Sequence, residues 1–242
     1  MLNSIEKGEN MDSHRKTAII VGVLFITATV AYSIGVIILD PILSSSDYLT
    51  KVSENENKVI LGAFLVLIDA VAVAGIGIMI YPILKKHNES LALGYAGARI
   101  AEGVLFIVNV IFILTILTLS QAFVKAGALD ASYYQTLGTL IQAVGEWIDP
   151  ILVIVFSISA LILNYIFYRS KLVPRWLSGL GLFGATLHLA EGVLAMFGFP
   201  EFSVLGIPLF LPIALQEMVY AVWLIVKGFN PSAIDSLSAK QE

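Results

Sequence analysis

The sequence predicts an all-α protein, a bundle of six helices that each cross a membrane. The first observation is composition: 58% of the 242 residues are hydrophobic, only 13% are charged, and the mean hydropathy is +0.89. Soluble domains contain about 45–50% apolar and about 25% charged residues, so this composition excludes ordinary soluble folds. The second observation is length, because six apolar stretches reach the roughly 20 residues that a helix needs to span a bilayer.

The six predicted spans are separated by connecting segments of different lengths, and the longest of these lie on the predicted outer side. Their ranges are Thr17–Leu39, Val59–Leu84, Leu91–Leu119, Trp147–Tyr168, Leu177–Phe199 and Val204–Val226. Residues 1–16 form a polar N-terminal segment, residues 17–228 the transmembrane domain, and residues 229–242 a polar tail. We therefore expect a multi-pass protein of the cell membrane, surrounded by the lipid bilayer.

The segment before the fourth span has a helical periodicity of its own. Within Gln121–Glu146, apolar side chains recur at helical spacing, at Tyr133, Leu137, Leu140, Ile141 and Val144. We expect an amphipathic helix that lies on the outer surface or extends the fourth span. Pro150 has no backbone N–H, so it should kink or break the helix near its position.

Lysine and arginine are distributed unevenly between the two ends of the predicted bundle. Ten lie in the N-terminus, the second and fourth loops and the C-terminus: Lys7, Arg15, Lys16, Lys85, Lys86, Arg169, Lys171, Arg175, Lys227 and Lys240. The other three loops contain only Lys51, Lys58 and Lys125. Because loops rich in lysine and arginine remain in the cytoplasm, both termini are predicted to be cytoplasmic.

Two helix hairpins share short sequences. Ala-Glu-Gly-Val-Leu occurs at Ala101–Leu105 and again at Ala190–Leu194, in spans three and five. Spans two and four both contain Ile-Asp, at Ile68-Asp69 and Ile148-Asp149. Hairpins two–three and four–five are therefore candidates for a parallel repeat, and the alternative is chance within a shared membrane composition.

Small residues also mark spans three and five. They are Gly94, Gly97, Gly179, Gly181 and Gly184. Because small residues let helices approach closely in lipid, we expect spans three and five to be central and in contact with each other.

Seven ionisable side chains lie inside the predicted spans, where each costs about 2.5–3.5 kcal/mol on insertion scales. They are Asp69, Arg99, Glu102, Asp149, His188, Glu191 and Glu217. Arg99 and Glu102 are three residues apart, as are His188 and Glu191, so each pair shares one helix face. The spans contain five acidic residues but at most two positively charged ones. Some of the carboxyl groups therefore need a proton, a bound cation or water.

Three functions remain open for these seven residues. The favoured one is the binding or translocation of a proton, a cation or a small polar solute, with the carboxyl groups as ligands or proton sites. The second is a membrane-embedded, metal-dependent enzyme of the lipid-hydrolase type, in which carboxylates and His188 hold a divalent ion. The third is a structural or accessory role. We favour a binding protein over an enzyme, and we expect no cofactor.

Two properties of the chain exclude other chemistry. It contains no cysteine, so disulfides, thiolate metal sites and cysteine nucleophiles are impossible. The net charge is −4 and no basic stripe is present, so nucleic-acid binding is not expected.

Several strings between about residues 15 and 230 resemble one known family. They are Arg15–Ala18 with Gly22–Ile26, Asn55–Asn57, Tyr81–Lys86, Leu91–Tyr95 leading to Arg99 and Glu102, Gln216–Met218 and Val222–Phe229. On these strings the chain resembles the prokaryotic membrane family known as domain of unknown function 4386. The resemblance implies a six-helix bacterial or archaeal membrane protein with no assigned activity, and it supplies no catalytic residues.

The predicted orientation can be tested with single cysteines, because the natural chain has none. Cysteines introduced at Ser45 and Ala128 should react with a membrane-impermeant thiol reagent added to intact cells. Cysteines at Asn88 and Ser238 should react only after the cells are permeabilised. Labelling of Asn88→Cys in intact cells would overturn the orientation.

Overall fold

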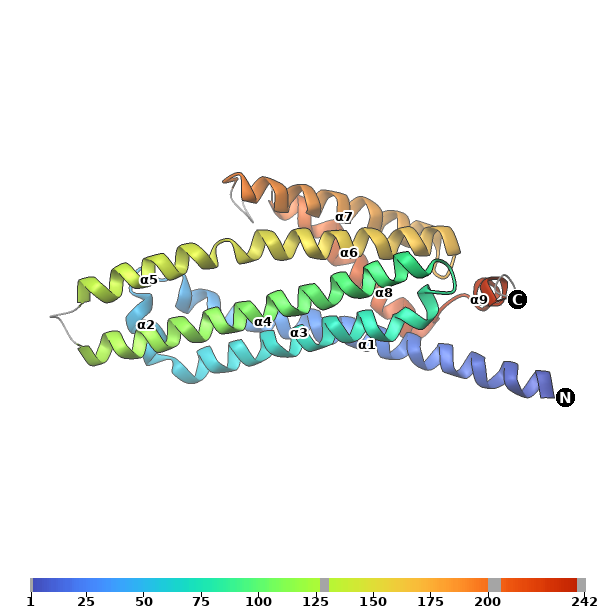
Figure 1. Ribbon diagram of the computed structural model, residues 1–242, viewed down its shortest axis with the longest axis horizontal. Coiled ribbons are helices and arrows are strands. Elements are labelled where there is room, and N and C mark those ends of the chain that lie inside the picture. Colours follow the sequence, from blue (N-terminus) through green and yellow to red (C-terminus); the bar gives the residue numbers. More distant parts are fainter. Residues whose placement is uncertain (1, 127–130, 200–205, 239–242) are drawn as a thin grey trace.

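The computed structural model describes residues 2–126, 131–199 and 206–238, and the regular secondary structure in these residues is α-helical (Figure 1). The helices are α1 (Leu2–Leu43), α2 (Tyr48–Glu54), α3 (Glu56–Leu84), α4 (Glu89–Ala126), α5 (Ala131–Gly145), α6 (Ile148–Ser170), α7 (Arg175–Met196), α8 (Gly206–Val226) and α9 (Pro231–Ser238). The predicted all-α class is therefore confirmed. Val204 and Leu205, where the sixth span was expected to begin, lie outside the described residues.

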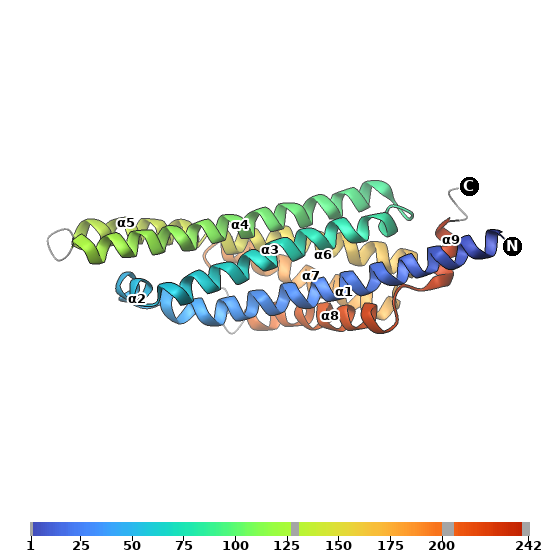
Figure 2. The same cartoon turned by 90° about the horizontal axis from the view of Figure 1, so that it is seen from below.

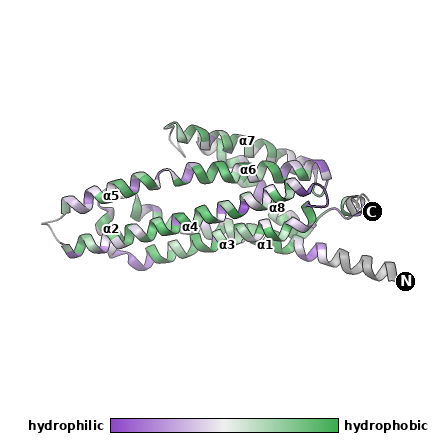
Figure 3. Cartoon of the chain, viewed as in Figure 1, coloured by the Kyte–Doolittle hydropathy of each residue, from purple (hydrophilic) through white to green (hydrophobic). Residues whose placement is uncertain are grey.

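Six helical segments of the described chain are long and apolar enough to cross a membrane, and they coincide with the six predicted spans. Large apolar side chains on these helices face outward: Ile37, Val71 and Leu93 are 71%, 66% and 63% exposed. Figure 3 shows hydrophobic residues along the full length of the bundle. Apolar surface of this extent is not left in water, so the chain is a multi-pass membrane protein in contact with lipid.

The end of the bundle opposite the termini carries additional helices (Figures 1 and 2). The 38 residues of α4 are about 57 Å long, which exceeds the hydrocarbon core of a bilayer. Helices α2 and α5 pack against this extension. Ser120 on α4 donates a hydrogen bond to the carbonyl oxygen of Leu49 in α2, and Gln142 on α5 donates to the carbonyl oxygen of Leu43.

The predicted amphipathic helix is confirmed as α5, which runs in line with α6 (Figure 1). The two helices are separated by a turn at residues 146–147, directly before the first turn of α6 that contains Pro150. A proline ring clashes with the carbonyl group four residues earlier, here that of Glu146, so the break falls where Pro150 requires it.

The expectation that spans three and five contact each other is wrong. Helix α4 packs against α3 and α6, whereas α7 packs against α6 and α8, so α6 lies between them (Figure 1). Gly97 and Gly179 have no neighbouring atom within 4 Å of an added methyl group, which means that they mediate no close helix contact. Gly181 and Gly184 do face neighbouring helices, but these are α6 and α8.

Helix α1 closes the bundle against α8 at the end that carries both termini. Arg15 donates hydrogen bonds to the carbonyl oxygens of Leu224 at 2.9 Å, Ile225 at 2.5 Å and Val226 at 3.3 Å. These carbonyl groups lie in the last turn of α8, where no later residue of the helix donates to them, and that of Leu224 also accepts from the backbone N–H of Gly228 at 3.1 Å. Arg15 therefore caps α8, a role that its position before the first span did not reveal.

The glycine contacts give a matched stability test. A methyl group at Gly103 would lie 2.8 Å from the carbonyl oxygen of Ala70, and one at Gly184 would lie 2.7 Å from the backbone nitrogen of Ile213. We expect Gly103→Ala and Gly184→Ala to destabilise the protein by about 1–3 kcal/mol, because the backbone of the neighbouring helix must move to make room for the methyl group. Gly97→Ala should be neutral or stabilising by up to about 1 kcal/mol, because alanine favours a helix. Thermal unfolding in detergent measures the stability of all three variants. Equal losses of stability in the three would contradict these contacts.

Candidate functional site

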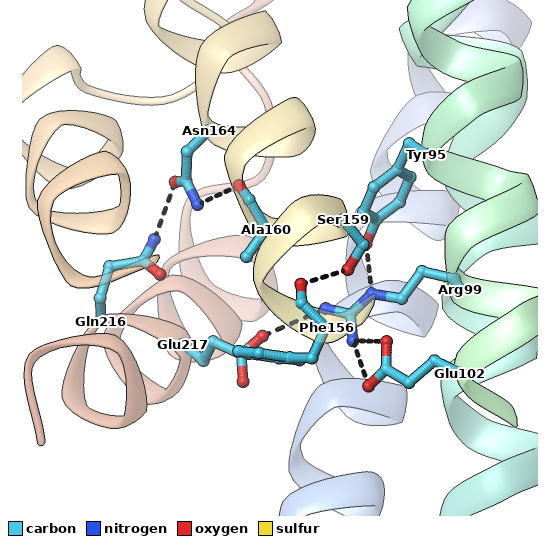
Figure 4. Close-up of polar contacts among 9 residues, drawn as sticks. All are labelled: Tyr95, Arg99, Glu102, Phe156, Ser159, Ala160, Asn164, Gln216 and Glu217. Carbon is cyan, nitrogen blue, oxygen red and sulfur yellow. Dashed lines mark hydrogen bonds and ion pairs between the residues drawn. The ribbon is translucent and has the colours of Figure 1, made fainter. Parts of the chain in front are cut away.

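Arg99 lies at the centre of a buried ion-pair network between α4 and α8 (Figure 4). Its Nη1 atom donates to both carboxylate oxygens of Glu102, at 3.2 and 3.1 Å. Its Nη2 atom donates to Oε1 of Glu217 at 3.1 Å. Arg99 is 2% exposed, so one guanidinium group connects two acids while it is shielded from solvent. The predicted Arg99–Glu102 pair is present, and Glu217 is a partner that sequence spacing did not identify.

Aromatic side chains complete the surroundings of Arg99. The Nε atom donates a hydrogen bond to the hydroxyl oxygen of Tyr95 at 3.1 Å, one helical turn earlier on α4. The guanidinium carbon lies 5.3 Å from the ring centroids of Phe25 on α1 and Phe156 on α6, and 5.6 Å from that of Tyr95. A cation at such distances is attracted to the ring faces. Helices α1 and α6 thus also contribute to holding the buried charge.

A second pair of ionisable groups lies on α7. The Nδ1 atom of His188 is 2.7 Å from Oε2 of Glu191, and both side chains are buried. This hydrogen bond joins the imidazole to the carboxyl group across one turn of α7. Phe156 and Phe210 lie beside the imidazole ring, at centroid distances of 5.4 and 5.2 Å. The ring is therefore oriented on both sides, as the three-residue spacing of the pair predicted.

Asp69 on α3 differs from the other buried acids. Its side chain is 3% exposed, yet its Oδ2 atom has no hydrogen-bond partner among the described residues. The close approach of Ala70 to Gly103 places Asp69 beside Glu102, and Asp69 interacts electrostatically with Glu102, Arg99 and Glu217. A buried carboxylate oxygen without a partner is costly, so this atom would be stabilised by a partner that the described residues do not supply.

A cavity of about 210 Å³ brings these residues together. It is lined by side chains from the six long helices, including Asp69, Arg99, Glu102, Asp149, His188 and Glu217. Glu191 does not line the cavity but orients His188. An engineered protein cavity of about 150 Å³ binds benzene, so this volume accommodates a small organic molecule or several waters.

The cavity lies in the middle of the bundle and extends toward the termini along α3 as far as Ile76. Along α1 its lining runs from Phe25 to Ser33, and along α6 from Phe156 to Asp149, in both cases away from the termini. Asp149 is an exposed residue at the far end of this lining. The terminal half is instead filled by a buried apolar cluster that includes Val21, Ile80 and Leu224. Asp149 is thus a lining residue that is exposed toward the end opposite the termini.

The described residues contain no group of three or more histidine, aspartate or glutamate side chains placed to hold a metal ion. Arg99 occupies two of the acids that a carboxylate-rich metal site would require, and His188 is paired with a third. The arrangement is thus an ion-pair network around Arg99 and a hydrogen-bonded His188–Glu191 pair beside Asp69, whose Oδ2 atom has no partner among the described residues. The seven predicted residues all belong to this arrangement or to its margin.

The buried network predicts non-additive stability effects. Arg99→Leu and Glu102→Leu should each destabilise the protein by about 3–5 kcal/mol, because each leaves a buried charge without its partner. The double variant should lose less than the sum of the single losses. Glu217→Gln should cost less than Glu102→Leu, because the Glu217 side chain is 17% exposed and an amide can still accept a hydrogen bond. Additive losses in a double-mutant cycle would show that Arg99 and Glu102 are not coupled.

The comparison with known families supports the resemblance found in the sequence. The family model described as Domain of unknown function (DUF4386) matches residues 20–228. No curated protein and no solved structure matched the chain. Because the family match covers most of the 242 residues, the chain belongs to the DUF4386 family.

Proposed function

We propose that this DUF4386 protein binds a small cation in its cavity, with the carboxyl group of Asp69 as the principal ligand. The observation that carries the proposal is that Asp69 lines the cavity and that its buried Oδ2 atom has no hydrogen-bond partner among the described residues. A bound cation or a proton on this group would satisfy it. This function agrees with the interpretation of the span carboxylates as a binding or translocation site.

The balance of charge around the cavity favours a positively charged ligand. Arg99 is the only arginine or lysine in the cavity lining, and it is already shared by Glu102 and Glu217. With these three groups ionised, the network carries one net negative charge, and ionised Asp69 would add a second. His188 faces its own carboxylate on Glu191. A cationic ligand would offset this excess of acid, whereas an anion would increase it.

The remaining lining favours an organic cation over a hydrated metal ion. Aromatic rings at Phe25, Tyr32, Phe106, Phe156 and Phe210 border the cavity. Ring faces attract ammonium-type cations and also pack against apolar groups attached to them. Metal ions such as Mg²⁺ instead require several oxygen ligands in fixed geometry. We therefore expect a small amine or quaternary ammonium group, with protons as competitors for the same carboxyl group.

We infer cytoplasmic termini from the distribution of lysine and arginine, and Asp149 lies at the opposite end of the lining and is exposed, so the proposed ligand would enter from the external side. The apolar cluster of the terminal half separates the cavity from the other side. Because the cavity is closed toward the termini, the structure is consistent with a protein that binds its ligand without transporting it. Translocation would additionally require the helices that form this cluster to separate, as in alternating access.

Two features support the proposed parallel repeat of α3–α4 and α6–α7. The glycine of each Ala-Glu-Gly-Val-Leu string packs onto the preceding helix of its own hairpin: Gly103 onto Ala70 and Ala74, and Gly192 onto Val153 and Ile154. The acid before each glycine pairs with a base three residues earlier. A repeat of this kind would place equivalent acids on two hairpins that border one cavity.

The proposal is tested by thermal unfolding of the detergent-solubilised chain in the presence of ammonium, tetramethylammonium, Na⁺, K⁺ and Mg²⁺ chlorides. Tetramethylammonium or ammonium should raise the melting temperature, because a ligand at 100 times its Kd stabilises the folded state by about 2.7 kcal/mol. The apparent affinity should weaken as the pH falls, because protons compete for Asp69.

Asp69→Asn should abolish this response while leaving or raising the stability of the unliganded protein. Glu54→Gln is the matched control, since it removes one negative charge at an exposed residue outside the cavity and should leave the response intact. Equal stabilisation by every salt, or a response that survives Asp69→Asn, would refute Asp69 as the ligand.

A further inference from the structure

A second pocket lies at the end of the bundle that carries the termini. It has a volume of about 480 Å³ and lies between the loop that joins α6 to α7 and the loop that joins α8 to α9. Its lining contains three cationic residues, Lys171, Arg175 and Lys227, and no acidic residue. This pocket shares no lining residue with the cavity that contains Asp69, so it stands independently of the function proposed above.

The charges of this pocket are available for a ligand. Lys171 and Lys227 are exposed, and neither forms an ion pair with a described residue. Arg175 uses its Nε atom to donate to the carbonyl oxygen of Tyr168 at 3.3 Å, and the guanidinium lies over the Tyr168 ring at 5.3 Å. These contacts fix the direction of Arg175 without neutralising its charge.

The walls of the pocket are held by backbone interactions. The backbone N–H of Asn230 donates to the carbonyl oxygen of Leu172 at 2.9 Å, and its side-chain amide donates to that of Lys171 at 3.3 Å. These bonds join the two loops. The carbonyl groups at the end of α8, which would add negative potential nearby, are already capped by Arg15. The pocket is therefore both formed and electropositive without a ligand.

Its surroundings are those of a membrane interface. Trp223, which lines the pocket, is half-buried, and the neighbouring Trp176 and Val226 are 60% and 62% exposed on the outer surface. Tryptophan is enriched at the level of lipid headgroups, where one part of the ring contacts apolar groups and the other contacts water. A molecule in this pocket thus borders both the aqueous phase and the apolar flank of α7 and α8.

We propose that this pocket binds the phosphate group of an anionic phospholipid, with Lys171, Arg175 and Lys227 as its contacts and the acyl chains along the apolar flank of α7 and α8. Basic pockets between the ends of membrane helices bind anionic headgroups in this way. The lipid source is favoured over a free phosphate ion because exposed apolar surface adjoins the basic residues.

The test compares melting temperatures of the full-length detergent-solubilised chain with dihexanoylphosphatidylglycerol, with dihexanoylphosphatidylcholine and with inorganic phosphate. The anionic lipid should raise the melting temperature by roughly 2–4 °C, and the zwitterionic lipid should raise it less. In K171Q/K227Q the difference between the two lipids should disappear, and in K227Q it should be reduced.

K16Q/K85Q is the matched control, because it removes two exposed lysines at the same end of the bundle that do not line the pocket. It should respond to the anionic lipid as the natural chain does. An equal loss in both double variants would assign the effect to general surface charge and overturn the site. Inorganic phosphate that reproduces the full shift would overturn the lipid as ligand, and so would the absence of any shift.

Discussion

The shared ion pair of Arg99 is the interaction on which the rest of the structure depends. A guanidinium group buried in a candidate membrane span is tolerated only with partners, and Arg99 has them on its own helix and on α8. Rings from α1 and α6 lie beside the same charge. Glu217 is 118 residues away in the chain, so this network fixes how the last span meets the third. Four of the long helices are positioned around one side chain.

This network lies where the cavity interrupts the apolar packing of the bundle. On the side of Arg99 toward the termini, a buried apolar cluster that includes Val21 and Leu224 fills the interior. A second apolar cluster, which includes Leu39 and Ile116, fills the end opposite the termini. Between the two clusters, the acids and His188 limit such packing, since a buried acid or imidazole needs a partner or water. The excess of acids over bases around this cavity supports the proposal of a cationic ligand.

The sequence predicts the elements well because span length and unusual charges are local properties. Each apolar stretch is recognisable by itself, and the seven ionisable residues stand out because charge within a span is rare. Contacts between helices are not local. In the sequence, Gly94, Gly97 and Gly103 look alike, as small residues within one span. In the structure, only Gly103 of these three packs closely against a neighbouring helix. Glu217 as a partner of Arg99, and Arg15 as the cap of α8, depend on which helices are adjacent, and no spacing along the chain encodes that.

Helix α8 is common to both proposed sites, and this constrains how they can influence each other. Glu217 borders the cavity and Lys227 lines the basic pocket, about 15 Å apart along the same helix. Three contacts fix α8 between them: the ion pair with Arg99, the close approach of Gly184 to Ile213, and the cap by Arg15. A ligand at one site can alter affinity at the other only if it binds two positions of α8 with different strength. Because all three contacts are short, a shift of α8 would break at least one of them. Coupling between the sites through a shift of α8 would therefore require the ion pair, the close packing at Gly184 or the cap by Arg15 to open.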